Sequence, residues 1–311
     1  MQKKIKKIVD RWKSDAFETK ILSQKIFQDL KLNLKYSPHP ISGWRSSPNQ
    51  DLETVKINSH GLRNNEFKLL EDNKDTCMLL GGSVAWGFGA SNNKNILSAL
   101  IEKSLEEKYK IKLNVINFAE QMHSSHEELM TFVGYVDEIN PKYVICLSGT
   151  NDINRGNSNF FKFSDLNNSW INFFNKGQVA KIINENNNLK YLFKSILKFN
   201  KYSQKVNESN YVFKKPHKDE IPNHLFKNKI EILNSICEQK NISVIHILQP
   251  DLILKKNKSK SEQDYIDFVD YERIEYSNKQ LEIFKKNYKS LELTKKNNKI
   301  AFIDHTEIFN D

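Results

Sequence analysis

Residues 76–87 read TCMLLGGSVAWG, and this stretch decides the fold class. It begins with a short, almost wholly apolar run, which two glycines and then Ser83 follow. Apolar runs of this length bounded by glycine are typical of buried strands. The glycines allow the chain to turn sharply where the strand ends, so that a helix can begin near Ser83. We therefore predict one strand, a tight turn and a helix here.

The same alternation continues along the chain. Apolar positions at helical spacing predict helices over residues 97–109, 127–139, 225–239 and 272–290. Short apolar runs predict further strands over residues 113–118, 143–147, 242–248 and 300–304. Strands that alternate with helices form a parallel sheet with helices packed on it. The predicted fold class is therefore α/β, with three α/β/α layers around a short parallel sheet.

The sequence divides into two parts, one of which carries an insertion. Residues 1–54 are expected to hold a basic amphipathic helix and then a linker, because residues 37–49 are rich in proline and serine. Residues 55–311 are expected to form the α/β domain. Within it, residues 153–225 are rich in Asn, Lys, Phe and Tyr and break the alternation, with a weak helical pattern at 189–197. We predict a helical or irregular insertion over 153–225.

The formal net charge of +10 is concentrated at the N-terminus. Residues 1–40 carry a surplus of +6, and the rest of the chain carries +4. The body lacks the regular interleaving of aromatic and basic residues that a nucleic-acid stacking surface needs, so we predict no nucleic-acid partner. The apolar stripe of the N-terminal helix favours packing on the protein itself. The alternative is reversible contact of residues 1–35 with an anionic membrane surface.

Composition bounds the class and compartment. With 38% hydrophobic and 11% aromatic residues, the chain is not of the disordered class. No apolar run approaches the about 18 residues that cross a bilayer, and Asp10 and Arg11 interrupt any signal-peptide core. We predict a cytoplasmic protein in which Cys77, Cys146 and Cys237 are free buried thiols. No cysteines or histidines have metal-ligand spacing, so we predict no metal and no cofactor.

Ser83 is the first candidate for chemistry. In open α/β sheets, ligands bind beyond the carboxyl ends of the strands, where Ser83 is expected to lie. A serine exposed on such a turn can serve as a nucleophile. The alternative is that Ser83 only caps the following helix.

A second candidate follows the strand at 143–147, where residues 148–152 read SGTND. Neighbouring parallel strands end at one edge of the sheet, so Asn151 can reach the space above Ser83. An amide at that point is a neutral donor suited to an oxyanion. The alternative is an ordinary turn. Residues 117–120, NFAE, end the strand between these two in sequence, which places a third segment around the same point.

These blocks resemble those of the SGNH (GDSL-like) hydrolase superfamily. Gly81, Gly82 and Ser83 match its first block, and residues 149–152 match its Gly-x-Asn-Asp block in full. The resemblance implies a flavodoxin-like SGNH fold and a nucleophilic Ser83. It also implies an oxyanion hole formed by the N–H groups of Ser83 and Ala119 and the amide of Asn151, with Gly82, Gly149 and Asp152 in support. Two positions depart from the family: Ala119 replaces a glycine, and Gly82 replaces an aspartate.

The base histidine is missing from the expected place. The family's Asp-x-x-His block follows the last strand, and residues 300–311 contain no such block, so the resemblance places this histidine beyond Asp311. His305 is a weaker candidate because it stands next to the strand and would have to bend into the site. The other histidines are expected to have structural roles: His123 and His126 near a helix start with the capping boxes Ser124-x-x-Glu127 and Ser125-x-x-Glu128, His246 in the core, and His39, His60, His217 and His224 in loops.

The resemblance implies a serine esterase that cleaves a small acyl ester, in particular an O-acetyl group of a carbohydrate or related metabolite. The partner would then be a small-molecule or glycan ester. Two alternatives stay open: an SGNH-like binding module without catalysis, because the base is absent, and an acyltransferase that uses the same serine. The sequence leaves the oligomeric state open.

Overall fold

The computed structural model describes residues 24–26, 28–66, 75–157, 221–252, 255–260, 262–263, 271–295 and 298–309. The predicted N-terminal helix lies mostly outside these residues. Most of the predicted insertion, with its helical pattern at 189–197 and His217, also lies outside them.

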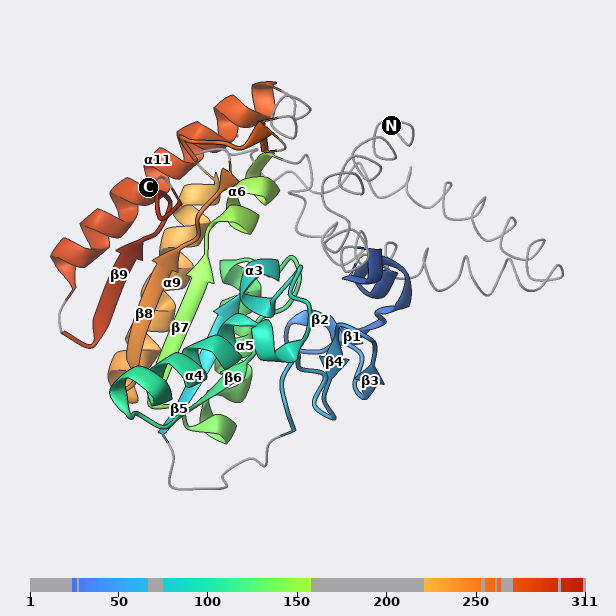
Figure 1. Cartoon of the computed structure of the whole chain (residues 1–311). Coiled ribbons are helices and arrows are strands. Elements are labelled where there is room, and N and C mark those ends of the chain that lie inside the picture. The colour runs from blue at the N-terminus through green and yellow to red at the C-terminus, as the bar shows by residue number, and fades with distance from the viewer. Residues whose placement is uncertain are drawn as a thin grey trace, which may run out of the picture.

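The centre of the protein is a five-stranded parallel sheet (Figure 1). Its strands are β5 (Asp75–Gly81), β6 (Leu113–Asn117), β7 (Tyr143–Ser148), β8 (Ser243–Leu248) and β9 (Ile300–Asp304). Their spatial order is β6-β5-β7-β8-β9. The chain therefore leaves β5 toward one edge of the sheet and returns to β7 on the other side, which is the doubly wound, flavodoxin-like order. The predicted fold class is confirmed.

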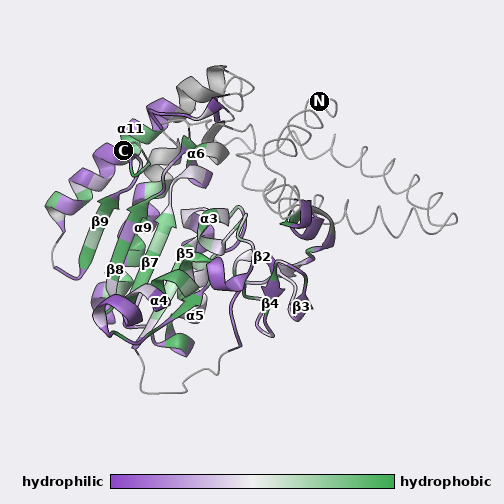
Figure 2. Cartoon of the chain, viewed as in Figure 1, coloured by the Kyte–Doolittle hydropathy of each residue, from purple (hydrophilic) through white to green (hydrophobic). Residues whose placement is uncertain are grey.

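Helices cover both faces of the sheet. On one face, α5 (Ser125–Ile139) and α9 (Ile221–Gln239) pack on apolar residues of β5, β7 and β8, and α6 (Thr150–Asn157) and α11 (Tyr271–Thr294) join them. On the other face, α3 (Ser83–Trp86) and α4 (Leu97–Tyr109) pack on β5 and β6. In Figure 2 the strands are mostly green and the helices carry purple on their outer sides. This division between apolar and polar sides follows from burying one face of each helix.

The bounds of the predicted helices and strands agree with the structure to within a few residues. Helix α4 and strand β9 have the predicted bounds. The ends of the predicted insertion are regular, because α6 includes residues 153–157 and α9 begins at Ile221. Residues 153–157 and 221–224 contain few apolar residues, which is why the sequence did not reveal these helix ends.

Residues 36–57, which include part of the predicted linker, contain short strands. They form two short antiparallel hairpins, β1 (Tyr36–His39) with β2 (Gly43–Ser46), and β3 (Gln50–Asp51) with β4 (Lys56–Ile57). A short π-helix, η1 (Asp29–Asn33), precedes them, and the carboxylate of Asp29 accepts bonds from the Thr54 N–H (2.7 Å) and hydroxyl (2.8 Å). Proline is tolerated in edge strands, and β1 is an edge strand of a two-stranded sheet, so Pro38 does not prevent the hairpin.

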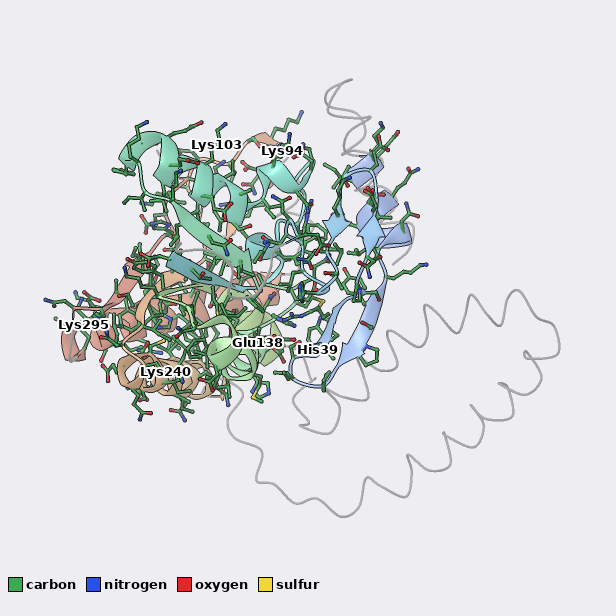
Figure 3. The ribbon with its side chains drawn as sticks, turned by 90° about the horizontal axis from the view of Figure 1, so that it is seen from below. His39, Lys94, Lys103, Glu138, Lys240 and Lys295 are labelled. Carbon is green, nitrogen blue, oxygen red and sulfur yellow. The ribbon has the colours of Figure 1, made fainter. Side chains whose placement is uncertain are left out.

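The cysteines lie in the core, and the labelled lysines lie at the surface. Cys77, Cys146 and Cys237 are free and buried, as predicted. Burial raises the pKa of the Cys77 and Cys237 thiols to about 12. In Figure 3 the labelled lysines lie on different sides at the outside of the body: Lys94, Lys103, Lys240 and Lys295. Among the described helices, none is long and apolar enough to span a bilayer.

Candidate active site

The candidate site lies where the strand order reverses, between β5 and β7. These strands pair in parallel, with Gly81 opposite Leu147, so both chains leave the sheet at the same edge. In open α/β sheets this switch point is the usual place for a ligand. Ser83 follows β5 and Asn151 follows β7, as the sequence predicted.

Ser83 is the first residue of α3, directly after Gly82. Gly81 has φ +152°, and a side chain there would meet the methyl of Ala85 at 2.6 Å, so the sharp turn requires glycine at this position. Ser83 is half-buried. Within the described part of the chain, its hydroxyl has no hydrogen-bond partner. The hydroxyl is therefore not committed to capping the helix.

Asn151 lies against the backbone that leads into Ser83. Its amide donates to the carbonyl oxygen of His123 (Nδ2 to O, 2.7 Å). A side chain on Gly82 would collide with this amide and would stand 3.1 Å from the same carbonyl. A side chain at position 82 would therefore require Asn151 to move. One of the two amide N–H bonds remains for another acceptor.

The N–H of Ala119 is committed elsewhere. It donates to Asn117 Oδ1 (3.2 Å), and the Asn117 amide lies 3.4 Å from the carbonyl oxygens of Arg63 and Trp86. Ala119 is buried. The predicted role of Ala119 in an oxyanion hole therefore requires its N–H to leave Asn117.

The supporting residues fix the loop after β7. Gly149 has φ +117°, and a side chain there would meet Leu248 at 2.7 Å. Asp152 is buried and accepts from the hydroxyl (2.5 Å) and the N–H (3.2 Å) of Ser125 at the start of α5. These contacts hold the segment that carries Asn151 to the helix beside it.

One of the two predicted capping boxes is confirmed. Ser124 is the N-cap of α5 and forms the box with Glu127. The prediction for Ser125 and Glu128 was wrong, because Ser125 binds Asp152 and Glu128 accepts from the Ser148 hydroxyl. A helix has one N-cap, here Ser124, so Ser125 and Glu128 bind residues of other segments instead.

His305 lies at the same edge of the sheet but far from Ser83. Its N–H donates to the carbonyl of Leu248 at the end of β8 (3.2 Å). It directly follows β9, three strand positions from β5, which is about 14 Å at the usual strand spacing. To act as the base, His305 would have to cross the ends of two strands.

Two other histidines, His246 and His39, make contacts within the fold. His246 is in the core, as predicted: its Nε2 lies 2.7 Å from Asn234 Oδ1, its ring stacks on Phe302, and burial lowers its pKa to about 3. The loop prediction was wrong for His224, which lies in α9, and for His39, which ends β1. His39 contacts Tyr135 Oη (2.9 Å) and Ser42 Oγ (3.0 Å). In the described residues, no group of three His, Cys, Asp or Glu side chains is arranged to hold a metal.

Sequence reasoning missed the buried charges beside the site. Glu120 is 1% exposed and accepts from the Ser46 N–H (2.6 Å) and from the Gln121 N–H (2.8 Å). Arg63 is fully buried; its guanidinium donates to the carbonyls of Gly87 (2.5 Å) and Thr54 (2.9 Å), and burial lowers its pKa to about 10. The available signal for Glu120 was a charged residue within three positions of an apolar strand end.

Several solved structures resemble this chain at low identity and low TM-score. The chain resembles a GDSL-like lipase from Bacteroides thetaiotaomicron (TM-score 0.36, 11% identity, 77% of this chain and 72% of that one). It also resembles the esterase EstA from Pseudoalteromonas sp. (TM-score 0.38, 10% identity, 74% and 77%) and the acetylxylan esterase Axe2 from Geobacillus stearothermophilus (TM-score 0.35, 12% identity, 76% and 78%). No family model and no curated protein matches the sequence.

Proposed function

We propose that the protein is a serine ester hydrolase in which Ser83 is the nucleophile. The observation that carries this proposal is the position of the Asn151 amide, which takes the space that a side chain on Gly82 would need. The oxyanion of an acyl-transfer intermediate develops next to the nucleophilic serine, so a hydrogen-bond donor at this point can stabilise it.

In the proposed reaction, Ser83 Oγ attacks the ester carbonyl and its proton passes to a base. The carbonyl oxygen gains the negative charge and accepts hydrogen bonds from the Ser83 N–H and from the free N–H of the Asn151 amide. The alcohol leaves with a proton, and water then releases the acid from Ser83. His305, the histidine described at the end of β9, does not reach Ser83 unless the end of β9 moves toward it.

The substrate class that we propose is a small acyl ester, in particular an O-acetyl group on a carbohydrate or related metabolite. The two sequence blocks that resemble SGNH hydrolases support this class. An acyltransferase would use the same acyl-enzyme, and product analysis with an added acceptor alcohol separates the two activities.

The test is hydrolysis of p-nitrophenyl acetate and of an O-acetylated oligosaccharide by the full chain. We expect turnover that Ser83→Ala lowers at least about 10³-fold, because the nucleophile is lost. The control is Ser235→Ala, a serine on the exposed side of α9 whose hydroxyl bonds only within the helix to Glu231. Turnover that survives Ser83→Ala would refute the proposal.

A second candidate is a binding module without catalysis. It is favoured by the finding that the Ser83 hydroxyl has no histidine partner among the described residues. Binding of an acetylated oligosaccharide without release of acetate would select this candidate.

A further inference from the structure

We infer that Glu120 and strand β2 are a positioning device for Asn151: they hold the loop whose carbonyl orients the Asn151 amide. This inference rests on the proposed function, since it gives Glu120 a role in placing a proposed oxyanion donor. Glu120 would not touch the substrate.

The first step is the dependence of Asn151 on the loop of residues 119–124. The Asn151 amide donates to the carbonyl of His123, so the plane of the amide follows the position of that carbonyl. The loop turns at Met122, which has φ +64°. Residues other than glycine rarely adopt this left-handed backbone conformation. The loop therefore keeps this shape only if neighbouring residues hold it.

The second step is the set of contacts that hold the loop. The Glu120 carboxylate accepts from the N–H of Gln121 within the loop and from the N–H and hydroxyl of Ser46 on β2 (2.8, 2.6 and 2.8 Å). Trp44 on the same strand donates its indole N–H to the Gln121 carbonyl (3.0 Å). The His123 ring packs edge-on against Trp44, with its Nε2 3.3 Å from the Trp44 carbonyl. β2 therefore holds the loop on both sides of Met122.

The third step is the electrostatics of Glu120. Burial raises the pKa of its carboxyl, and the hydrogen bonds from Gln121 and Ser46 and the charge of Arg45 act against that rise. Arg45 is itself buried, with its guanidinium 5.5 Å from the ring centre of Phe118 and 5.1 Å from that of Tyr135. A buried carboxylate with charge-assisted bonds fixes geometry more firmly than a neutral acceptor. A Gln side chain at position 120 would replace one accepting oxygen by an NH₂ group. This group would face the N–H donors of Ser46 or Gln121 and could not accept their hydrogen bonds.

The test compares Glu120→Gln with Asn151→Ala and with the double variant. We expect Glu120→Gln to lower kcat about tenfold with KM within twofold, because a misplaced donor weakens transition-state stabilisation more than binding. In the Asn151→Ala background, the same change should lower kcat less than twofold, because the donor that it positions is gone. Additive losses would overturn the inference.

The matched control is Glu102→Gln. Glu102 on α4 also accepts a backbone N–H, that of Val115 in the middle of β6 (2.7 Å), away from the loop of residues 119–124. It should cost thermal stability and leave kcat within twofold. An equal loss of kcat in both Gln variants would show a merely structural effect. If Glu120→Gln does not fold, Ser46→Ala removes one donor to the carboxylate, and we expect about a threefold loss of kcat that likewise disappears in the Asn151→Ala background.

A readout without turnover separates this inference from the proposed function. The Asn151 side-chain amide gives ¹⁵N–¹H NMR signals that Asn151→Ala identifies by their loss. Glu120→Gln should shift them and speed their hydrogen exchange, and Glu102→Gln should leave them in place. Unshifted signals in Glu120→Gln would overturn the positioning role even if Ser83 is the nucleophile. Shifted signals in a protein without Ser83-dependent turnover would uphold the positioning and refute the hydrolase proposal.

Discussion

The two halves of the sheet's carboxyl edge are built differently. At the ends of β6 and β7, buried or half-buried groups far apart in sequence contact one another: Asn151 binds His123, and Asp152 binds Ser125. At the end of β9, Asp304 accepts from the N–H (2.9 Å) and hydroxyl (2.6 Å) of the nearby Thr306, and the segment contacts distant residues through a backbone bond from His305 to Leu248 and exposed ion pairs of Glu307. The difference teaches that the segment carrying Asn151 is held by side-chain contacts below the surface, whereas the segment carrying His305 is held by its own turn, a backbone bond and surface charges.

The largest expected effect within the first half is that of Asn151→Ala. Loss of the amide removes a donor to the oxyanion, and we expect kcat to fall roughly 10²–10³-fold, about 2.7–4 kcal/mol. Steady-state kinetics with p-nitrophenyl acetate measure the change. Asn95→Ala, at an exposed site near α4, is the control and should be silent. A loss below threefold in Asn151→Ala would remove Asn151 from the mechanism.

Gly82→Ala should give the next largest effect. Gly82 has φ −88°, which alanine adopts freely, so the backbone conformation is not strained. The new methyl would displace the Asn151 amide, and we expect kcat to fall about 10- to 100-fold because even a shift near 1 Å can be that costly. In the Asn151→Ala background the loss should shrink. Full turnover by Gly82→Ala would contradict the contact between these residues.

His246 in β8 is expected to affect the pH dependence of the free energy of unfolding rather than catalysis. Burial lowers the pKa of His246 to about 3 from an ordinary 6.5. Below about pH 6.5 the unfolded chain therefore binds more protons than the folded one, and stability falls as pH drops toward 3, by at most about 1.4 kcal/mol per pH unit for this group.

Urea unfolding of the wild type and His246→Leu between pH 7 and 4 tests this expectation. The variant should show a flatter pH dependence and unchanged kcat at pH 7. His39, whose pKa burial lowers to about 4, supplies an acid sensitivity that remains in the variant. Equal pH slopes in the two proteins would mean that His246 is not buried in its neutral form.

The smallest expected effect is that of His305→Ala. Because about 14 Å separates the end of β9 from that of β5, we expect kcat to change less than twofold. The full pH–rate profile is the measurement. A loss above 100-fold, together with loss of one limb of the profile, would make His305 the base and would require the β9 end to move toward Ser83.

Much of this architecture could be predicted from the sequence because its signals are local. The apolar run before Gly81 and the periodicity of residues 97–109 specify β5 and α4 without knowledge of the rest of the chain. The convergence of Ser83 and Asn151 followed from the parallel order of neighbouring strands. These properties depend on periodicity and topology, which a sequence displays directly.

The contacts that hold the site could not be predicted in this way. Tyr135 and His39 are 96 positions apart, and Ser46 and Glu120 are 74 apart. Their partners are selected by the tertiary packing of the N-terminal hairpin, and its prolines and serines are typical of a loop. The commitment of the Ala119 N–H to Asn117 was hidden for the same reason, because the side chain of Asn117 could equally have faced solvent.

The central claim, that Ser83 is an activated nucleophile, is tested most directly by covalent labelling. The full chain is incubated with a fluorophosphonate, which reacts with nucleophilic serines, and its intact mass is measured. We predict the gain of a single phosphonyl group that peptide mapping places on Ser83, that Ser83→Ala lacks and that Ser235→Ala retains. An unmodified wild-type protein, or an equal adduct on Ser83→Ala, would contradict the account.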